Sequence, residues 1–288
     1  MDTAPLLKLR SAGYEVVDNP YKRKLTKQEL LQLLTDDTIG LIAGLETIDR
    51  DVLLKSKLRV VSRVGSGISN VDVGAAKELG IQVFSTPAGP TEAVAELTVG
   101  AMICLVRMVS AMDNALHNGL WDKKIGFQVE GKTVMIIGFG RIGRRVAELL
   151  KPFHVVLLIV DPFLQDEDAR PYRRLSLEHA LPQADIISLH CGGETCVLGD
   201  REFALMKRGV FILNAARGGV MSEDALKTNL ESGLVAGAWL DTFKSEPYRD
   251  SLSAFSNVLL TPHVGSYTRE SRLQMETEAV ENLLKGLG

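Results

Sequence analysis

Four polar side chains in the second half of the chain have the types that proton and hydride chemistry needs. Each follows the end of an apolar run typical of a buried strand: Arg217, Asp241, Glu246 and His263. Carboxyl ends of parallel strands meet at one edge of a sheet, and ligands bind beyond that edge. A histidine can act as an acid or base near neutral pH. A carboxylate can hold its ring, and an arginine offers a planar fork to a substrate carboxylate.

Each of these residues also has a plainer interpretation when it is taken alone. His263 follows a Thr-Pro turn and could be a structural hydrogen-bond donor. Arg217 precedes two glycines and could be a solvated loop charge, while Glu246 precedes Pro247 and could belong to a turn. Their joint placement downstream of a glycine motif favours the catalytic interpretation.

That glycine motif is Gly138-Phe-Gly140-Arg-Ile-Gly143, which lies between the apolar run 133–137 and a helical pattern. Gly138 permits a tight turn, Gly140 lets backbone amides approach a pyrophosphate, and Gly143 lets helix and strand pack closely. The start of the following helix directs its unpaired N–H groups at the phosphates. Asp161 ends the next apolar run and can accept the ribose hydroxyls, so the motif predicts NAD rather than NADP. An ordinary glycine-rich turn is the alternative.

Strand-like and helix-like segments alternate along the whole chain, which is typical of an α/β protein with parallel sheets. The expected strands of the first block are 14–17, 38–43, 60–64 and 82–85, with helices at 27–34, 51–55 and 73–79. Those of the second block are 133–137, 155–160, 185–189, 210–213, 236–240 and 258–260. One helix over about 91–117 joins the blocks, and a last helix over about 268–285 is expected to pack on the first. We therefore expect two domains, 1–91 with 266–288 and 92–265.

Composition excludes several classes of protein. The 288 residues are 45% hydrophobic, enough for one large core or two modest ones. A net charge of −3 with interspersed signs gives no basic surface for nucleic acid and no membrane-binding stripe. The longest apolar helical pattern, 93–112, carries Glu96 and Arg107, which indicates a buried helix rather than a membrane span. No signal peptide is recognised. The three cysteines lack metal-ligand spacing, so we expect reduced thiols in the cytoplasm and no metal.

Several motifs, in order, make the chain resemble the D-isomer-specific 2-hydroxyacid dehydrogenase family over nearly its whole length. They are the segments 63–72, 94–98, 138–143, 214–219, 241–247 and 261–265. The resemblance implies catalytic roles for Arg217, Glu246 and His263. It implies cofactor contacts at Thr98, Gly138, Gly140, Arg141, Ile142, Gly143, Asp161, His190, Cys191, Ala215, Ala216, Arg217, Asp241, His263 and Gly265. The Asp241 carboxylate would accept a hydrogen bond from the carboxamide of the nicotinamide. Arg63, Ser66 and Gly67 would bind substrate together with Arg217 and His263, and a homodimer would form through the cofactor domain.

The chain departs from the family pattern at the substrate side and at its start. Phosphoglycerate-oxidising members often carry an arginine in the loop after the strand 38–43, where this chain has Gly44, so recognition of a phosphate stays open. The family's substrate domain begins with a strand, whereas here the helix-like segment 4–10 comes almost first. Either the chain is truncated or the small domain is reorganised.

The sequence thus predicts an α/β protein with a doubly wound, Rossmann-type NAD domain and a smaller flavodoxin-like substrate domain lacking its usual first strand. The predicted activity is NAD-dependent hydride transfer at C2 of a D-2-hydroxy acid or 2-keto acid, of phosphoglycerate dehydrogenase or hydroxypyruvate/glyoxylate reductase type. Two alternatives stay open at this point. One is an NAD(H)-sensing protein resembling the corepressors of the same family, and the other is an N-terminally truncated, impaired dehydrogenase.

Overall fold

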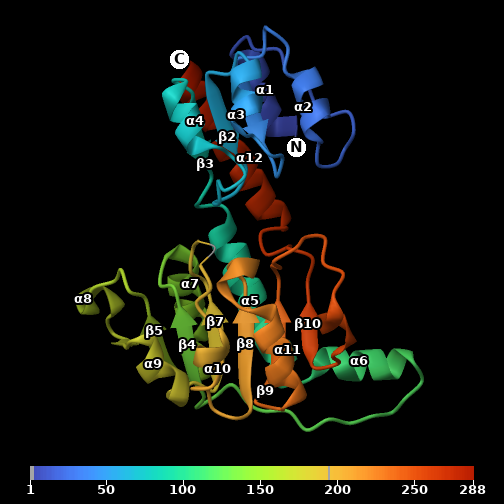
Figure 1. Ribbon diagram of the computed structural model, residues 1–288, viewed down its shortest axis with the longest axis vertical. Coiled ribbons are helices and arrows are strands. Elements are labelled where there is room, and N and C mark those ends of the chain that lie inside the picture. The colour runs from blue at the N-terminus through green and yellow to red at the C-terminus, as the bar shows by residue number, and fades with distance from the viewer. Residues whose placement is uncertain (1–2, 194) are drawn as a thin grey trace. The chain divides into compact units, whose positions relative to one another are not determined.

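The computed structural model describes residues 3–193 and 195–288 and divides into two compact units (Figure 1). The first comprises Met1–Thr91 and Ser266–Gly288, and the second comprises Glu92–Gly265. Each has its own parallel sheet, so the alternation of strands and helices in the sequence is confirmed as an α/β fold.

The second unit is built on a seven-stranded parallel sheet in the order β10-β9-β8-β7-β4-β5-β6. The strands are β4 (Thr133–Ile137), β5 (Val156–Val160), β6 (Arg173–Arg174), β7 (Ile186–Leu189), β8 (Val210–Asn214), β9 (Val235–Leu240) and β10 (Val258–Leu260). The strand order reverses between β4 and β7, which is the doubly wound arrangement and its ligand-binding point. Both faces of the central strands are buried, which explains their continuous apolar runs.

Helices cover both faces of this sheet (Figure 1). The helices of this unit are α5 (Pro90–Val106), α6 (Val109–His117), α7 (Arg141–Leu150), α8 (Asp166–Ala169), α9 (Leu177–Ala180), α10 (Asp200–Phe203) and α11 (Glu223–Glu231), of which α5, α7, α9, α10 and α11 pack on the sheet. Single 3-10 turns lie at η1 (Lys151–Phe153), η2 (Leu181–Gln183), η3 (Gly218–Val220) and η4 (Ser251–Ala254). The short strand β6, at one edge of the sheet, was not predicted, because two consecutive arginines carry no apolar pattern.

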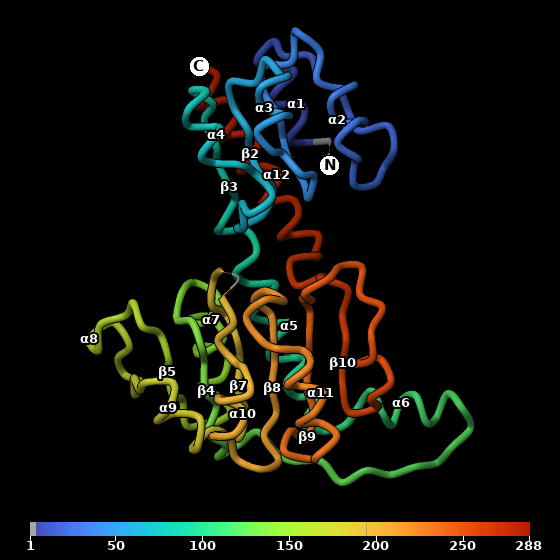
Figure 2. Tube along the Cα trace, viewed as in Figure 1, coloured from blue at the N-terminus to red at the C-terminus, as the bar shows by residue number. Residues whose placement is uncertain are grey.

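The single helix expected over 91–117 is wrong, because the structure has two helices bent by 67° at this point. Met108 takes the left-handed conformation with φ 55°. The carbonyl of Val106 accepts the N–H of Phe127 at 2.9 Å, a partner from outside the helix. The Phe127 segment therefore replaces the next helical turn. Past the bend, α6 and the following strand-free segment project from the unit, as Figure 2 shows.

The first unit has a three-stranded parallel sheet in the order β1-β2-β3, made of β1 (Gly40–Ala43), β2 (Val60–Arg63) and β3 (Gln82–Ser85). Its helices are α1 (Thr3–Ser11), α2 (Lys27–Leu33), α3 (Arg50–Lys55), α4 (Val73–Glu78) and α12 (Arg269–Leu287). The last helix, α12, contacts all three strands, as expected from the sequence. One apolar cluster joins α1, α12 and β2, and a second lies among α2, α3 and α4.

The strand expected at 14–17 is wrong, and its residues show why. The N–H of Tyr14 bonds to the carbonyl of Leu9 at 3.1 Å, so it caps α1 instead of joining a ladder. Tyr14 and Val16 still pack against the apolar cluster, which accounts for the alternating pattern. Within the described residues, no strand pairs with the outer edge of β1.

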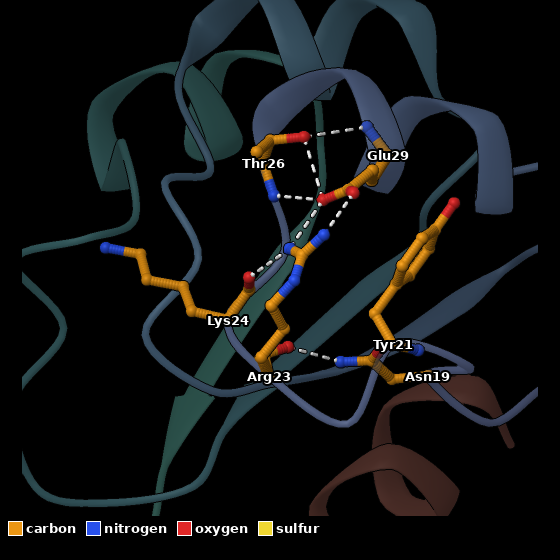
Figure 3. Close-up of polar contacts among 6 residues, drawn as sticks. All are labelled: Asn19, Tyr21, Arg23, Lys24, Thr26 and Glu29. Atoms are coloured by element: carbon orange, nitrogen blue, oxygen red, sulfur yellow. Dashed lines mark hydrogen bonds and ion pairs between the residues drawn. The ribbon is translucent and has the colours of Figure 1, made fainter.

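The segment that follows folds back on itself through polar contacts (Figure 3). The guanidinium of Arg23 meets the Glu29 carboxylate with two hydrogen bonds of 2.6 and 2.9 Å. Thr26 and Glu29 form a capping box at the start of α2. The Arg23 guanidinium lowers the pKa of Glu29 to about 2. Among residues 3–193 and 195–288, no single helix has the length and hydropathy to cross a membrane. Only the bent pair α5 and α6, taken together, has the length and hydropathy required.

Candidate active site

Three loops at one edge of the second unit's sheet carry the residues singled out for catalysis. They follow β8, β9 and β10, which are adjacent and parallel. Arg217 lies in the first loop, Asp241 and Glu246 in the second, and His263 in the third. The parallel register therefore brings their backbones to the same edge.

His263 and Glu246 form a hydrogen-bonded pair. The ring nitrogen Nδ1 of His263 lies 2.9 Å from Oε2 and 3.1 Å from Oε1 of Glu246. Oε1 also accepts the backbone N–H of Phe243 at 3.1 Å, so the carboxylate is fixed from a second direction. The two side chains are 40% and 36% exposed, which leaves the ring accessible to a ligand while its carboxylate partner holds it.

The loop that carries His263 is fastened to the sheet by Asp241, which is almost fully buried. Its Oδ1 accepts the N–H of Val264 at 2.9 Å and the hydroxyl of Thr261 at 2.6 Å, and its Oδ2 accepts the N–H of Gly265 at 2.8 Å. His263 between these anchors has a positive φ of 54°. Asp241 therefore shapes the loop, a role the sequence did not predict. Its expected contact with a carboxamide stays a prediction.

Sequence reasoning also missed Thr261 and Trp239. The indole N–H of Trp239 donates to Oγ1 of Thr261 at 3.0 Å, and that hydroxyl donates onward to Asp241. Trp239 is a fully buried strand residue, so this chain of hydrogen bonds ties the loop to the interior. The only signal in the sequence was an indole and a hydroxyl near the ends of neighbouring apolar runs.

Arg217 is held in place by its own loop. Buried Asn214 accepts the N–H of Ala216 at 3.0 Å and donates to the carbonyl of Arg217 at 3.0 Å. The guanidinium donates to the carbonyl of Ala216 at 2.7 Å through Nη1. Asn214 closes β8 as an apolar run ends, and the sequence had not assigned it this role.

The loops of Arg217 and Glu246 touch through Gly218. A Cβ on Gly218 would overlap the carbonyl carbon and oxygen of Phe243 and the backbone nitrogen of Lys244. The neighbouring N–H of Phe243 is the group that fixes the Glu246 carboxylate. Thus a backbone contact connects Arg217 to the His263–Glu246 pair.

The glycine motif has the close packing that its spacing predicts. Gly138 has φ 91°, and a Cβ there would lie 2.5 Å from the nitrogen of Cys191. A Cβ on Gly143 would overlap the carbonyl oxygen of Gly138. By contrast, apart from the two neighbouring residues in the chain, no atom in the described part lies within 4 Å of a Cβ on Gly140, and no side chain there caps α7. The first N–H groups of α7, from Arg141 and Ile142, are therefore open to an anion, which fits a pyrophosphate.

Asp161 directly follows β5, beside this motif. Its Oδ2 accepts the N–H of Phe139 at 2.8 Å, and its Oδ1 accepts the N–H of Phe163 at 3.0 Å. Each carboxylate oxygen has a second acceptor position, so the group can still receive ribose hydroxyls. The donors at α7 and this acceptor together suit a dinucleotide.

His190 and Cys191 follow β7 at the point where strand order reverses. Burial lowers the pKa of His190 to about 4, so its ring is neutral near pH 7. The ring Nε2 lies 2.8 Å from Oγ of Ser188, while buried Nδ1 has no partner within the described residues. Burial raises the pKa of Cys191, which keeps it a thiol.

Other predicted residues belong to other elements of the chain. Thr98 is fully buried in α5, and its hydroxyl donates to the carbonyl of Val94 at 2.7 Å, so its expected cofactor contact stays a prediction. Arg63, Ser66 and Gly67 belong to the first unit, at the carboxyl end of β2. There Arg63 donates to the carbonyl of Val64 at 2.7 Å. Over the residues described, no group of metal-ligating side chains gathers.

Comparison with known proteins gives consistent matches. Residues 99–265 match the model of the D-isomer specific 2-hydroxyacid dehydrogenase, NAD binding domain. The chain is 38% identical over 273 residues to D-3-phosphoglycerate dehydrogenase of Rattus norvegicus, covering 92% of this chain and 51% of that protein. It is 35% identical to hydroxypyruvate reductase of Thermotoga maritima, covering 92% and 89%. The chain thus spans about half the length of the phosphoglycerate dehydrogenase and nearly all of the reductase.

A solved structure agrees with these sequence matches. The crystal structure of a glyoxylate reductase from Paecilomyes thermophila superimposes with a TM-score of 0.89 at 29% identity, covering 98% of this chain and 91% of that one.

Proposed function

Because the chain belongs to the D-isomer specific 2-hydroxyacid dehydrogenase family, we propose that it interconverts a small 2-keto acid and its D-2-hydroxy acid with NAD as cofactor. The observation that supports this most directly is the His263–Glu246 pair, joined at 2.9 Å beside the loop of Arg217. A proton must reach or leave the C2 oxygen during such a reaction. This imidazole is the group that can carry that proton.

The second unit supplies the residues that hold NAD. The N–H groups of Arg141 and Ile142 take the pyrophosphate, and Asp161 takes the ribose hydroxyls. When bound, NAD accepts a hydride at its nicotinamide, and NADH donates one. The Asp161 carboxylate repels a 2′-phosphate, which gives the preference for NAD over NADP.

His263 is the acid and base. Glu246 occupies Nδ1 of the ring, so Nε2 is the nitrogen that holds the exchangeable proton. In keto-acid reduction Nε2 donates this proton to the C2 oxygen, and in the reverse direction it takes the proton back. The Glu246 carboxylate orients the ring and stabilises the imidazolium that precedes reduction.

Arg217 binds the substrate carboxylate and polarises the C2 carbonyl through its planar donors. We assign the first unit to substrate binding, with Arg63 and the backbone N–H groups of Ser66 and Gly67 as further carboxylate ligands. These roles come from the family resemblance, and the position of the three residues at the carboxyl end of a parallel strand supports them.

Two histidines with nearly the same positive φ offer a matched test of the acid-base role. His263 and exposed His154 have φ of 54° and 51°, a region that asparagine tolerates. His263→Asn should lower kcat for glyoxylate or hydroxypyruvate reduction by about 100-fold or more, whereas His154→Asn should leave it unchanged. The rate is followed at the NADH absorbance band. Wild-type kcat in His263→Asn would disprove the assignment.

We also propose a homodimer formed through the second unit, as the family resemblance implies. Segment 109–127, which contains α6, exposes large apolar side chains, among them Trp121 at 79% and Ile125 at 96%. Beside it lies a small apolar pocket lined by Cys104, Met108, Phe127, Phe211 and Leu259 among others. Exposed apolar surface of this kind is typical of protein interfaces.

The oligomeric state tests this assignment directly. Light scattering should give twice the chain mass for wild type, and the double variant Trp121→Asp with Ile125→Asp should give a monomer. Exposed Phe163→Asp, in the second unit but outside this segment, should remain dimeric. A monomeric wild-type protein would contradict the proposal.

A further inference from the structure

Two loops run side by side at the carboxyl edge of the first unit's sheet, one after β1 and one after β2. The N–H of Ile48 donates to the carbonyl of Asn70 at 2.8 Å, and Ile48 pairs with Val71 in an isolated bridge. The amide of Asn70 donates to the carbonyls of Glu46 at 2.6 Å and Gly44 at 3.2 Å. The tip of the first loop is thereby fixed to the loop that carries Ser66 and Gly67.

The side chain at this tip is a carboxylate. Oε2 of Glu46 accepts the N–H of Gly44 at 2.8 Å, and a Cβ on Gly44 would lie 3.0 Å from the same oxygen. Glu46 therefore folds over the position where a side chain at residue 44 would extend. It is half-buried and held by its own loop, so its charge has a defined place.

The other carboxylates of the two loops have partners that account for them. Asp49 caps α3 and pairs with Lys27 at 2.7 Å, and Asp72 caps α4. The Arg63 guanidinium donates to the neutral carbonyl of Val64 and keeps its positive charge, which we assign above to the C1 carboxylate. The tip of the loop after β1 thus presents the negative charge of Glu46.

We propose that Glu46 is a specificity-determining residue that selects 2-keto acids with an uncharged group on C3 and rejects those carrying a phosphate there. The inference rests on the proposed function. If Ser66 and Gly67 hold the C1 carboxylate, the C3 substituent extends no more than a few bonds from them, near the loop that Asn70 ties down. A phosphate dianion there meets the fixed charge of Glu46, whereas a hydroxyl can donate to it.

The experiment compares glyoxylate, hydroxypyruvate and 3-phosphohydroxypyruvate as substrates with NADH. Wild type should favour hydroxypyruvate over its phosphate ester by at least about tenfold in kcat/KM, a ratio that charge repulsion of modest strength supplies. Glu46→Gln keeps an oxygen for the Gly44 N–H but removes the charge. Glu46→Gln should reduce the kcat/KM ratio of hydroxypyruvate to its phosphate ester about tenfold, by lowering the KM of the phosphorylated acid. Glu281→Gln, at an exposed ion pair on α12 with Lys8, is the matched control and should not change it.

Salt separates an electrostatic role from a structural one. Raising ionic strength from about 0.01 M to 0.15 M should narrow the preference for hydroxypyruvate more in wild type than in Glu46→Gln, because the variant lacks the carboxylate charge that salt screens. The inference would be overturned if the wild type preferred the phosphorylated acid, or if the ratio were unchanged in Glu46→Gln. In either case, turnover of glyoxylate would still support the proposed function. No turnover of any of the three acids would overturn both.

Discussion

The loop of Arg217 lies on the loop of Glu246 through a contact that only glycine permits at position 218. A Cβ on Gly218 would come well within 3.0 Å of the Phe243 carbonyl carbon and oxygen and of the Lys244 nitrogen. All three are backbone atoms, so no side chain can rotate to make room. In Gly218→Ala the two loops must therefore separate by a distance on the order of 1 Å.

A displacement of this size moves Arg217 away from the His263–Glu246 pair and releases the Phe243 N–H that fixes Glu246. Misplacement of catalytic groups by about 1 Å lowers rates about 100-fold. We therefore expect kcat/KM to fall about 100-fold, or about 2.7 kcal/mol in transition-state stabilisation. Overpacking should also lower the free energy of unfolding by about 1–3 kcal/mol.

Steady-state kinetics with glyoxylate and NADH, together with urea unfolding, measure both effects. Gly100→Ala is the control, because a Cβ at that position in α5 would meet no described atom within 4 Å beyond its chain neighbours and the backbone of its own helix. This variant should keep full activity, and its free energy of unfolding should rise by up to about 1 kcal/mol, since alanine has a higher helix propensity than glycine. If Gly218→Ala kept both wild-type kcat/KM and wild-type stability, the coupling of these loops would be refuted.

Three further predictions follow from contacts in the second unit. Asp161→Ser should raise the ratio of kcat/KM with NADPH to that with NADH by about tenfold, because the repelling carboxylate is gone; an unchanged ratio would exclude its role at the ribose. Burial lowers the pKa of His190 to about 4, against about 6.5 when unfolded. As pH drops from about 6.5 to 4, the His190 ring takes up a proton in the unfolded chain but not in the folded one, so the free energy of unfolding falls. His190→Gln cannot take up this proton and should lose up to about 3 kcal/mol less over that range, as measured by urea unfolding at each pH. Thr261→Val should lower kcat and reduce the free energy of unfolding by about 1–3 kcal/mol, because it leaves the buried Trp239 N–H without its acceptor. Thr261→Ser keeps the hydroxyl and should retain wild-type kcat and stability. If the two variants behaved alike, the role of the Thr261 hydroxyl between Trp239 and Asp241 would be contradicted.

The parts of this fold that the sequence predicted are those determined by local pattern. The strands β4 and β10 begin and end as expected, because their apolar runs are bounded by polar or turn residues. The glycine motif was recognised for the same reason, since tight turn and close approach depend on residues a few positions apart. The pairing of His263 with Glu246 was also predicted, and the structure confirms their contact.

What the sequence did not predict depends on partners distant in the chain. The break after α5 follows from a hydrogen bond between Val106 and Phe127, and no pattern in the helix announces it. The role of Asp241 in shaping the His263 loop follows from acceptors and donors that meet only when β9 and β10 lie side by side. Hydrogen-bond partners of this kind cannot be read from residue type alone.

Under the acid-base role that we propose for His263, its positive φ places stability and turnover in opposition at one position. A positive φ such as that of His263 costs about 1 kcal/mol or more in a residue other than glycine or asparagine. Glycine at 263 would relax the chain but could not carry a proton. Selection for heat resistance in this lineage should therefore leave the imidazole alone and strengthen the Asp241 anchor beneath it.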